Sequence, residues 1–184
     1  MRTDGPGQSA LLLLDAVVIL EREGVGYAVV GAMAGSVHGV VRASVDADAV
    51  VSVGFQELSK LADTFRTMGL ATHIRRGDPD DPIDAVLALR DSHDNQVDLI
   101  AGLRGLEPAA FSRAVEVPFQ GQRLRIIGRE DFIAMKLYAG GPVDLDDARK
   151  AIAFDRESLN LELLERLAGN YGDRTLAVLK AMDL

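Results

Sequence analysis

The sequence contains no cysteine among its 184 residues and has only three histidines, His38, His73 and His93. The absence of cysteine excludes disulfide bonds and every site built on a thiolate. Because the histidines are widely separated, we do not expect a histidine-rich zinc site. A bound metal should instead be a hard ion held by carboxylates.

The chain also lacks an apolar run long enough to cross a bilayer. Its most apolar stretch, Ala10–Leu20, is interrupted by Asp15 and falls far below the ~20 apolar residues that a membrane helix needs. The stretch has neither the basic flank nor the small-residue cleavage site of a targeting signal. We therefore expect a soluble, cytoplasmic protein without membrane contact.

Positive charge is in short supply, because 20 Lys and Arg residues face 28 Asp and Glu residues, for a net charge of −8. A protein this acidic is a poor candidate for coating nucleic acid by bulk attraction, since phosphate neutralisation needs clustered basic side chains. Basic residues do gather locally, at Arg75-Arg76 and at Arg123 and Arg125. A local basic landing surface is therefore compatible with the sequence.

The length is typical of one domain with a substantial core. Apolar periodicity predicts seven strands over residues 27–30, 45–53, 70–74, 83–90, 96–101, 115–119 and 123–127. It predicts helices over residues 10–23 (with Ser9 as the N-cap), 56–68, 107–113, 130–139, 145–154, 159–170 and 172–182, and a tight turn into a short helix over 31–39. The expectation is an α/β core over residues 1–128 and a helical C-terminal subdomain over 129–184.

Two aspartates, Asp46 and Asp48, alternate with alanine on the predicted strand 45–53. Residues i and i+2 of a strand share a face, ~6.5–7 Å apart, so two such carboxylates on a buried strand repel each other and lose hydration. The arrangement is tolerated where cations lie between them, and Mg²⁺ fits because it takes oxygen ligands and leaves room for substrate phosphates. The structural alternative is an edge strand whose aspartates face solvent.

Two further features strengthen the metal interpretation. Gly31-Ala32 follows a predicted strand and opens a helix, a geometry in which backbone N–H groups hold a phosphate. Asp98 lies within its own predicted strand, on the face opposite Val97 and Leu99. Three aspartates in a sheet beside a phosphate turn are the components of metal-assisted nucleotidyl transfer, in which two ions clamp the attacking and leaving oxygens.

The order of these residues resembles the signature of the polymerase-β-type nucleotidyltransferase superfamily, a hydrophobic-Gly-Gly/Ser turn followed after a short spacer by Asp-x-Asp/Glu. More narrowly, it is similar to the AbiEii toxin-like nucleotidyltransferases of bacterial toxin–antitoxin and phage-defence loci. The residues that carry the likeness are Gly31, His38-Gly39, Arg42, Ser44, Asp46-Ala47-Asp48 and, in a second block, Lys136 within Arg129–Ala139, followed by Asp144 and Asp147.

The resemblance implies a nucleotidyltransferase-like mixed β-sheet flanked by helices, with Mg²⁺ or Mn²⁺ as cofactor and a nucleoside triphosphate as substrate. Asp46 and Asp48 would ligate the metals, and Asp98 would complete the second site and act as general base or orient the acceptor. Gly31 would lie against the β,γ-phosphates and Lys136 would neutralise them. The implied reaction leaves a nucleoside monophosphate on an acceptor and releases pyrophosphate.

The implied nucleotide-binding set also includes Ala32, Arg42, Ser44 and Asp144. Three departures from the family pattern stand out: Ala32 replaces a second Gly or Ser, Ser44 replaces Thr, and Gly140-Gly141-Pro142-Val143 replaces a basic stretch. Because alanine dislikes positive φ and fewer cations would face the phosphates, these departures put full activity in question.

Several of these side chains have a structural alternative. Arg42 binds the triphosphate or acceptor, or pairs with a neighbouring carboxylate. Lys136 serves the phosphates, or extends from the core edge toward solvent. Asp144 and Asp147 suit a helix N-terminus, and one of them would also position Lys136. His38 suits a helix end.

Three functions therefore compete. The first is a nucleotidyltransferase acting on an RNA or protein acceptor, as the toxin of a toxin–antitoxin pair with a cognate antitoxin as partner. The second is a catalytically weakened module that binds a nucleotide or a partner protein. The third is an enzyme that modifies a small cationic molecule such as an aminoglycoside, which an acidic cleft would suit.

Overall fold

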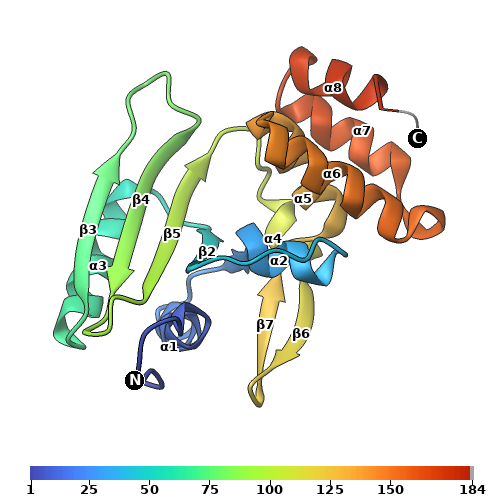
Figure 1. The fold of residues 1–184 in the computed structure, drawn as a ribbon. Helices are drawn as coiled ribbons and strands as arrows, with labels where there is room; N and C mark the ends of the chain where they lie inside the picture. The colour runs from blue at the N-terminus through green and yellow to red at the C-terminus, as the bar shows by residue number, and fades with distance from the viewer. Residues whose placement is uncertain (183–184) are drawn as a thin grey trace.

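The computed structural model describes residues 1–182 and has one seven-stranded mixed sheet, in the order β3-β4-β5-β2-β1-β7-β6 (Figure 1). The strands are β1 (Tyr27–Val29), β2 (Asp46–Val51), β3 (Ala71–Arg76), β4 (Ile83–Arg90), β5 (Gln96–Leu103), β6 (Val115–Phe119) and β7 (Gln122–Ile126). Each predicted strand is present, with ends that differ by at most two residues. The expected mixed sheet flanked by helices is confirmed.

The helices also match the predicted periodicity. They are α1 (Ser9–Arg22), α2 (Gly31–Val37), α3 (Phe55–Thr67), α4 (Ala109–Arg113), α5 (Arg129–Ala139), α6 (Pro142–Phe154), α7 (Leu161–Asn170) and α8 (Asp173–Lys180), with a 3₁₀ turn at Arg156–Ser158.

The prediction that Ser9 is the N-cap of the first helix is wrong. Gln8 is at the cap position, and Ser9 is the first helical residue. The Ser9 hydroxyl is buried and donates to the carbonyl of Val45 at 2.6 Å. A tertiary partner, Val45 just before β2, has therefore replaced the local capping partner.

The two faces of the sheet have different roles. Helices α1 and α3 pack over one face, and the fully buried side chains of β2 and β5 belong to it: Ala47, Ala49, Val97 and Leu99. The half-buried residues that alternate with them, including Asp46, Asp48 and Asp98, lie on the opposite face. That face is toward the C-terminal helices (Figure 1).

Helix α5 attaches these C-terminal helices to the α/β part through α2. The Phe132 ring on α5 is buried, lies 5.5 Å from the His38 ring, and would contact a Cβ atom at Gly35 at 3.5 Å. These contacts join residues on the two sides of residue 128. The expected division into an α/β core and a helical subdomain at that residue stays a prediction.

Among residues 1–182, no helix combines the length and apolarity that crossing a membrane requires.

Candidate active site

The structure brings the three predicted aspartates together on one face of the sheet. Asp48 of β2 and Asp98 of β5 are directly paired across parallel neighbouring strands, which lie about 4.8 Å apart. Asp46 lies two residues before Asp48 on β2 and therefore on the same face of the sheet. All three residues are half-buried, and β2 is a central strand rather than an edge strand. The alternative of solvent-facing edge-strand aspartates is therefore wrong.

The electrostatics of this cluster show negative charge that neighbouring cations compensate only in part. Burial raises the pKa of Asp48, and the neighbouring carboxylates of Asp98 and Asp46 raise it further, against the opposing effects of Arg42 and Lys136. Burial also raises the pKa of Asp98, where a hydrogen bond from Gln96 opposes the shift. The cluster therefore favours any cation that can lie against it.

Gly31 lies against the Asp48 carboxylate. Its φ is +62°, in the left-handed region, and a Cβ atom there would overlap Asp48 Oδ2. The backbone N–H of the preceding residue, Val30, donates to the Asp48 carbonyl at 2.9 Å. Glycine is therefore required at position 31 both by backbone conformation and by the approach of Asp48. Ala32 follows as a buried residue of α2.

Lys136 faces the same side of the sheet from α5, paired with two carboxylates of α6. Its Nζ lies 2.7 Å from Asp144 Oδ1 and 2.9 Å from Asp147 Oδ2, and its side chain is 13% exposed. Arg42 Nε lies 3.4 Å from the same Asp147 oxygen. The ammonium is thus held in ion pairs rather than extended to solvent, and both Asp144 and Asp147 hold it. Arg42 pairs with a carboxylate, which is one of its two predicted roles.

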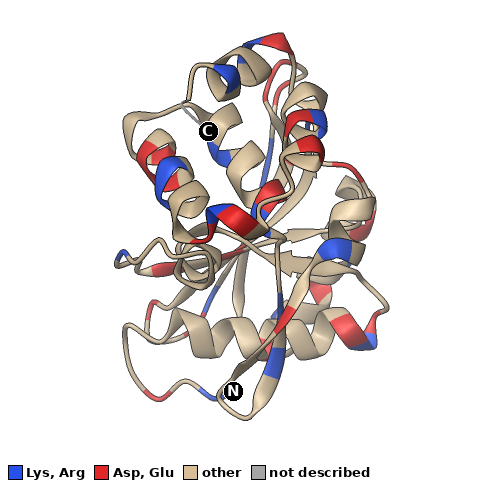
Figure 2. Cartoon of the chain, turned by 90° about the vertical axis from the view of Figure 1, so that its right-hand side faces the viewer, with Lys and Arg blue, Asp and Glu red and all other residues tan. Residues whose placement is uncertain are grey.

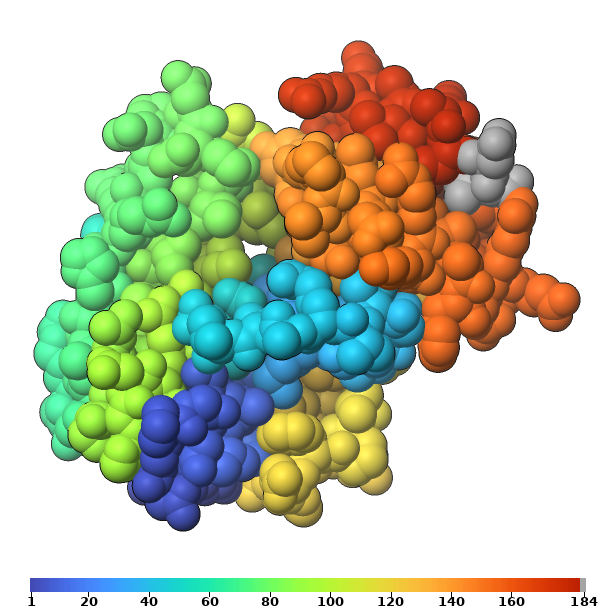
Figure 3. Space-filling model, viewed as in Figure 1, coloured from blue at the N-terminus to red at the C-terminus, as the bar shows by residue number. Residues whose placement is uncertain are grey.

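The segment between α2 and β2 carries the remaining predicted residues. Ser44 Oγ donates to the Asp46 carbonyl at 3.0 Å. Arg42, Ser44 and Asp46 line a cavity of about 200 Å³ together with Ala32, Met33 and Ser36 of α2. Figure 3 shows this segment, in cyan, below a hollow between the green strands and the orange helix α6.

A second cavity, of about 350 Å³, begins two residues beyond the aspartates on the same strands. Val50 lies two residues after Asp48, Ile100 lies two residues after Asp98, and both line this cavity. The other lining residues come from the strand ends and the region of α4: Val51, Ser52, Gly102, Leu103, Leu106, Pro108 and Phe111. The cavity is apolar, so it suits an uncharged part of a ligand.

Residues Gly140–Val143 make the turn from α5 into the start of α6. They are the residues that replace a basic stretch in the pattern described above. Gly140 has φ +68° at the end of α5, and Pro142 is at the start of α6. This turn brings Asp144 and Asp147 back toward Lys136. His38 has the predicted structural role, because it ends α2 and its buried Nε2 lies 2.8 Å from the Ile127 carbonyl.

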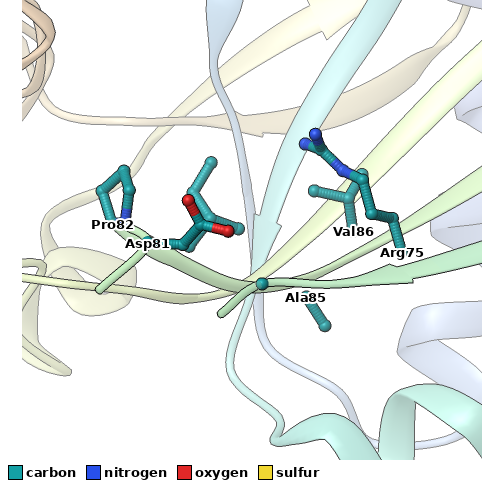
Figure 4. A pocket seen from close by; sticks show the side chains of 7 residues that line it. Arg75, Asp81, Pro82, Ala85 and Val86 are labelled. Carbon is teal, nitrogen blue, oxygen red and sulfur yellow. The ribbon is translucent and has the colours of Figure 1, made fainter. Parts of the chain in front are cut away.

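The two basic groups do not form one landing surface. Arg75-Arg76 lie on edge strand β3, whereas Arg123 and Arg125 lie on β7 near the other edge, and acidic and basic residues are interspersed over the chain (Figure 2). Arg75 lines a pocket of about 110 Å³ at the tip of β3 and β4, with Val86 on the same side of the sheet and Ala85 on the other (Figure 4).

Three contributors were missed by sequence reasoning or named only in passing. Asp147 bridges Arg42 and Lys136, Gln96 donates to Asp98 Oδ1 at 2.9 Å, and Ser9 connects the starts of β2 and β5. Gln96 had a usable signal, because it stands two residues before Asp98 and so shares its face. Ser9 had none, since its partners are 36 and 87 residues away.

The donor set suits a divalent hard cation, although within residues 1–182 no three His, Asp or Glu side chains already surround a common point. Mg²⁺ binds through one or two carboxylates and completes its shell with water and substrate phosphates. Paired, half-buried carboxylates with raised pKa values offer that partial site.

No family model matches the chain, and no curated protein matches it at a significant level. Solved structures do match. The antibiotic-resistance factor ANT(2″)-Ia superposes with a TM-score of 0.62 at 15% identity, covering 92% of this chain and 94% of that one; it has also been solved with adenylyl-2″-tobramycin.

Two further solved structures are similar to this chain in fold. A Thermotoga maritima protein assigned as a nucleotidyltransferase has a TM-score of 0.57 at 15% identity, over 83% of this chain and 97% of that one. The lincosamide antibiotic adenylyltransferase LnuA, bound to lincomycin, has a TM-score of 0.51 at 13% identity, over 83% and 99%. The chain therefore has the nucleotidyltransferase fold.

Proposed function

We propose that this protein is a metal-dependent nucleotidyltransferase that transfers a nucleoside monophosphate from a nucleoside triphosphate to an acceptor hydroxyl. The observation that carries the proposal is the pairing of Asp48 with Asp98 across β2 and β5, beside Asp46 and against Gly31. Half-buried carboxylates that neighbouring cations compensate only in part destabilise a fold, so their convergence points to a cationic ligand.

Each side chain has a role in this reaction. Asp46, Asp48 and Asp98 would hold Mg²⁺ or Mn²⁺, which when bound polarises the α-phosphate. Asp98 accepts the proton of the acceptor hydroxyl or orients it. The acceptor oxygen forms the new bond to phosphorus, and the bond to the pyrophosphate oxygen breaks. Lys136 balances the charge of the leaving pyrophosphate.

Binding of the triphosphate would use the two cations that lie near the aspartates, Lys136 and Arg42. In this scheme Lys136 and Arg42 would each add phosphate oxygens to their contacts, while Asp147 keeps both cations close to the aspartates. Ala32, Ser44 and Asp144 would complete the nucleotide site, as backbone, hydroxyl and lysine-positioning groups.

The resemblance to AbiEii-type proteins favours RNA or protein as the acceptor, in the role of a toxin with a cognate antitoxin. A small-molecule acceptor is the second candidate. The apolar cavity beyond Val50 and Ile100 favours it, as does the likeness in fold to two antibiotic-modifying proteins. The dispersed basic residues give an RNA acceptor no single docking surface.

A label-transfer assay tests the proposal. The protein is incubated with each α-³²P-labelled nucleoside triphosphate, Mg²⁺ or Mn²⁺, and total RNA, cell lysate or an aminoglycoside panel. The product that carries the label identifies the acceptor class. Nuclease-sensitive label indicates RNA, protease-sensitive label indicates protein, and label in a new small product that is not a nucleotide of the starting mixture indicates a small-molecule acceptor. A folded protein that transfers no label under any of these conditions favours instead the weakened binding module, for which Ala32 and the Gly140–Val143 turn are the relevant departures.

A further inference from the structure

A hydrogen-bond chain runs from β4 to the aspartate cluster. Arg90 Nη2 donates to Gln96 Oε1 at 2.8 Å, and Gln96 Nε2 donates to Asp98 Oδ1 at 2.9 Å. Arg90 and Gln96 are directly paired in the β4–β5 register, and Gln96 and Asp98 are two residues apart on one face of β5. The chain therefore reaches Asp98 from the side opposite β2.

The end groups of this chain fix the orientation of the Gln96 amide. A guanidinium group only donates hydrogen bonds, and an ionised carboxylate only accepts them. The amide oxygen must therefore face Arg90, and the amide NH₂ must face Asp98. With the amide turned over, both hydrogen bonds would be lost, so the arrangement has one stable form.

The backbone of Gln96 is anchored as well. Its N–H donates to Ser9 Oγ at 3.0 Å, and the Ser9 hydroxyl donates in turn to the Val45 carbonyl at 2.6 Å. Ser9 is 5% exposed. The starts of β2 and β5 are thus tied through one buried hydroxyl, and the Gln96 side chain projects from a fixed point.

We infer that Gln96, itself oriented by Arg90, is a positioning residue for Asp98, holding Oδ1 so that Oδ2 is left for the proposed reaction. This inference rests on the proposed nucleotidyl transfer. The hydrogen bond from Gln96 thereby favours a single rotamer of the Asp98 carboxylate.

The kinetic test compares Gln96→Leu, Arg90→Met and the double variant in the label-transfer assay, with total RNA and cell lysate as acceptor preparation. Gln96→Leu is expected to lower kcat about 10- to 100-fold through lost orientation and to leave KM for the nucleotide unchanged. Arg90→Met should lower kcat less, and the double variant should match Gln96→Leu, since the two residues act as one unit. Gln56→Leu, at an exposed position of α3 on the other face of the sheet, is the matched control.

A spectroscopic readout is independent of activity. In ¹H–¹⁵N spectra, the Gln96 side-chain NH₂ signal should shift in Asp98→Ala and in Arg90→Met, while that of Gln56 should not. An unchanged kcat in folded Gln96→Leu, additive losses in the double variant, or an unmoved NH₂ signal would each overturn the inference. If the wild-type protein transfers no label, the proposed function fails, and the NH₂ signal alone decides whether Gln96 holds Asp98.

Discussion

At the scale of single residues, Asp48 combines burial with two carboxylate neighbours, and this has a cost for stability. Its folded-state pKa lies above the unfolded value, so in the window between the two values the native protein binds more protons than the unfolded chain. Native stability therefore falls as pH rises through that window. Above that window, without a bound cation, the fold bears this whole cost.

Asp48→Asn should consequently stabilise the metal-free protein at pH 7, by about 1 kcal/mol in the range usual for relieved active-site strain. The gain should shrink as the pH falls toward ~4, where the aspartate of the unfolded chain is also protonated. Urea denaturation at several pH values measures both effects. Asp80→Asn in the exposed 77–82 turn serves as control, and a loss of stability in Asp48→Asn at pH 7 would contradict the account.

Gly31→Ala should remove nucleotide binding and destabilise the fold, because the new methyl group meets Asp48 Oδ2 and the positive φ disfavours alanine. The φ effect alone costs about 1–2 kcal/mol. Gly121→Ala is the matched control, since its φ is +74° and nothing lies within 4 Å of its Cβ position. Calorimetry with a non-hydrolysable triphosphate should show binding to Gly121→Ala and none to Gly31→Ala; equal binding would show that Asp48 tolerates displacement.

At this scale the sequence predicts which aspartates share a face of the sheet, but not which side chains lie next to them. The i, i+2 alternation is enough to place Asp46 and Asp48 on one face, and the apolar neighbours of Asp98 place it in a strand. Their adjacency needs the strand order, which places β5 next to β2. The partners of Lys136 also depend on the turn at Gly140, whose angle no local pattern specifies.

At the scale of elements, α5 and α6 are joined at the site by Asp147. Its side chain is 3% exposed, and its Oδ2 faces Lys136 and Arg42 as an ion-pair partner without hydrogen-bond geometry. One buried carboxylate thus holds a cation from α5 and another from the segment before β2. Without Asp147, Arg42 would lose its carboxylate partner and Lys136 would keep only Asp144.

Asp147→Asn should therefore destabilise the protein by about 2 kcal/mol, because it leaves two cations without their buried counter-charge. It should also raise the nucleotide KM, since Lys136 and Arg42 lose their common anchor. Asp146→Asn is a close control, because Asp146 is exposed and pairs with Lys150 on the helix surface. Thermal unfolding and transfer kinetics check both variants, and equal behaviour of the two would remove the anchoring role of Asp147.

Local pattern predicts the elements well because each strand and helix has a clear period and the turn residues mark its ends. The Ser9 cap fails for a physical reason. A buried hydroxyl satisfied by Val45 and Gln96 has no need of the helix amides, and only tertiary structure supplies those partners.

At the scale of the whole molecule, the sheet and the C-terminal helices share a core. Phe132 of α5 is 2% exposed and packs near Gly35 of α2 and near His38, which follows that helix. Phe132→Ala is expected to cost about 3–5 kcal/mol and to lower one cooperative transition followed by circular dichroism and by calorimetry. Two separate transitions, with only one of them shifted, would show instead that residues 1–128 and 129–184 unfold independently.

The most direct test of the central claim, that Asp46, Asp48 and Asp98 hold a metal–nucleotide complex, is a Mn²⁺ titration in the presence of an α,β-methylene triphosphate. The wild-type protein is expected to bind Mn²⁺ only with the nucleotide present, and Asp46→Ala and Asp48→Ala are expected to abolish this binding. Asp98→Ala should lose part of the bound Mn²⁺ and keep the nucleotide. Undiminished Mn²⁺ binding in Asp46→Ala and Asp48→Ala would contradict the account.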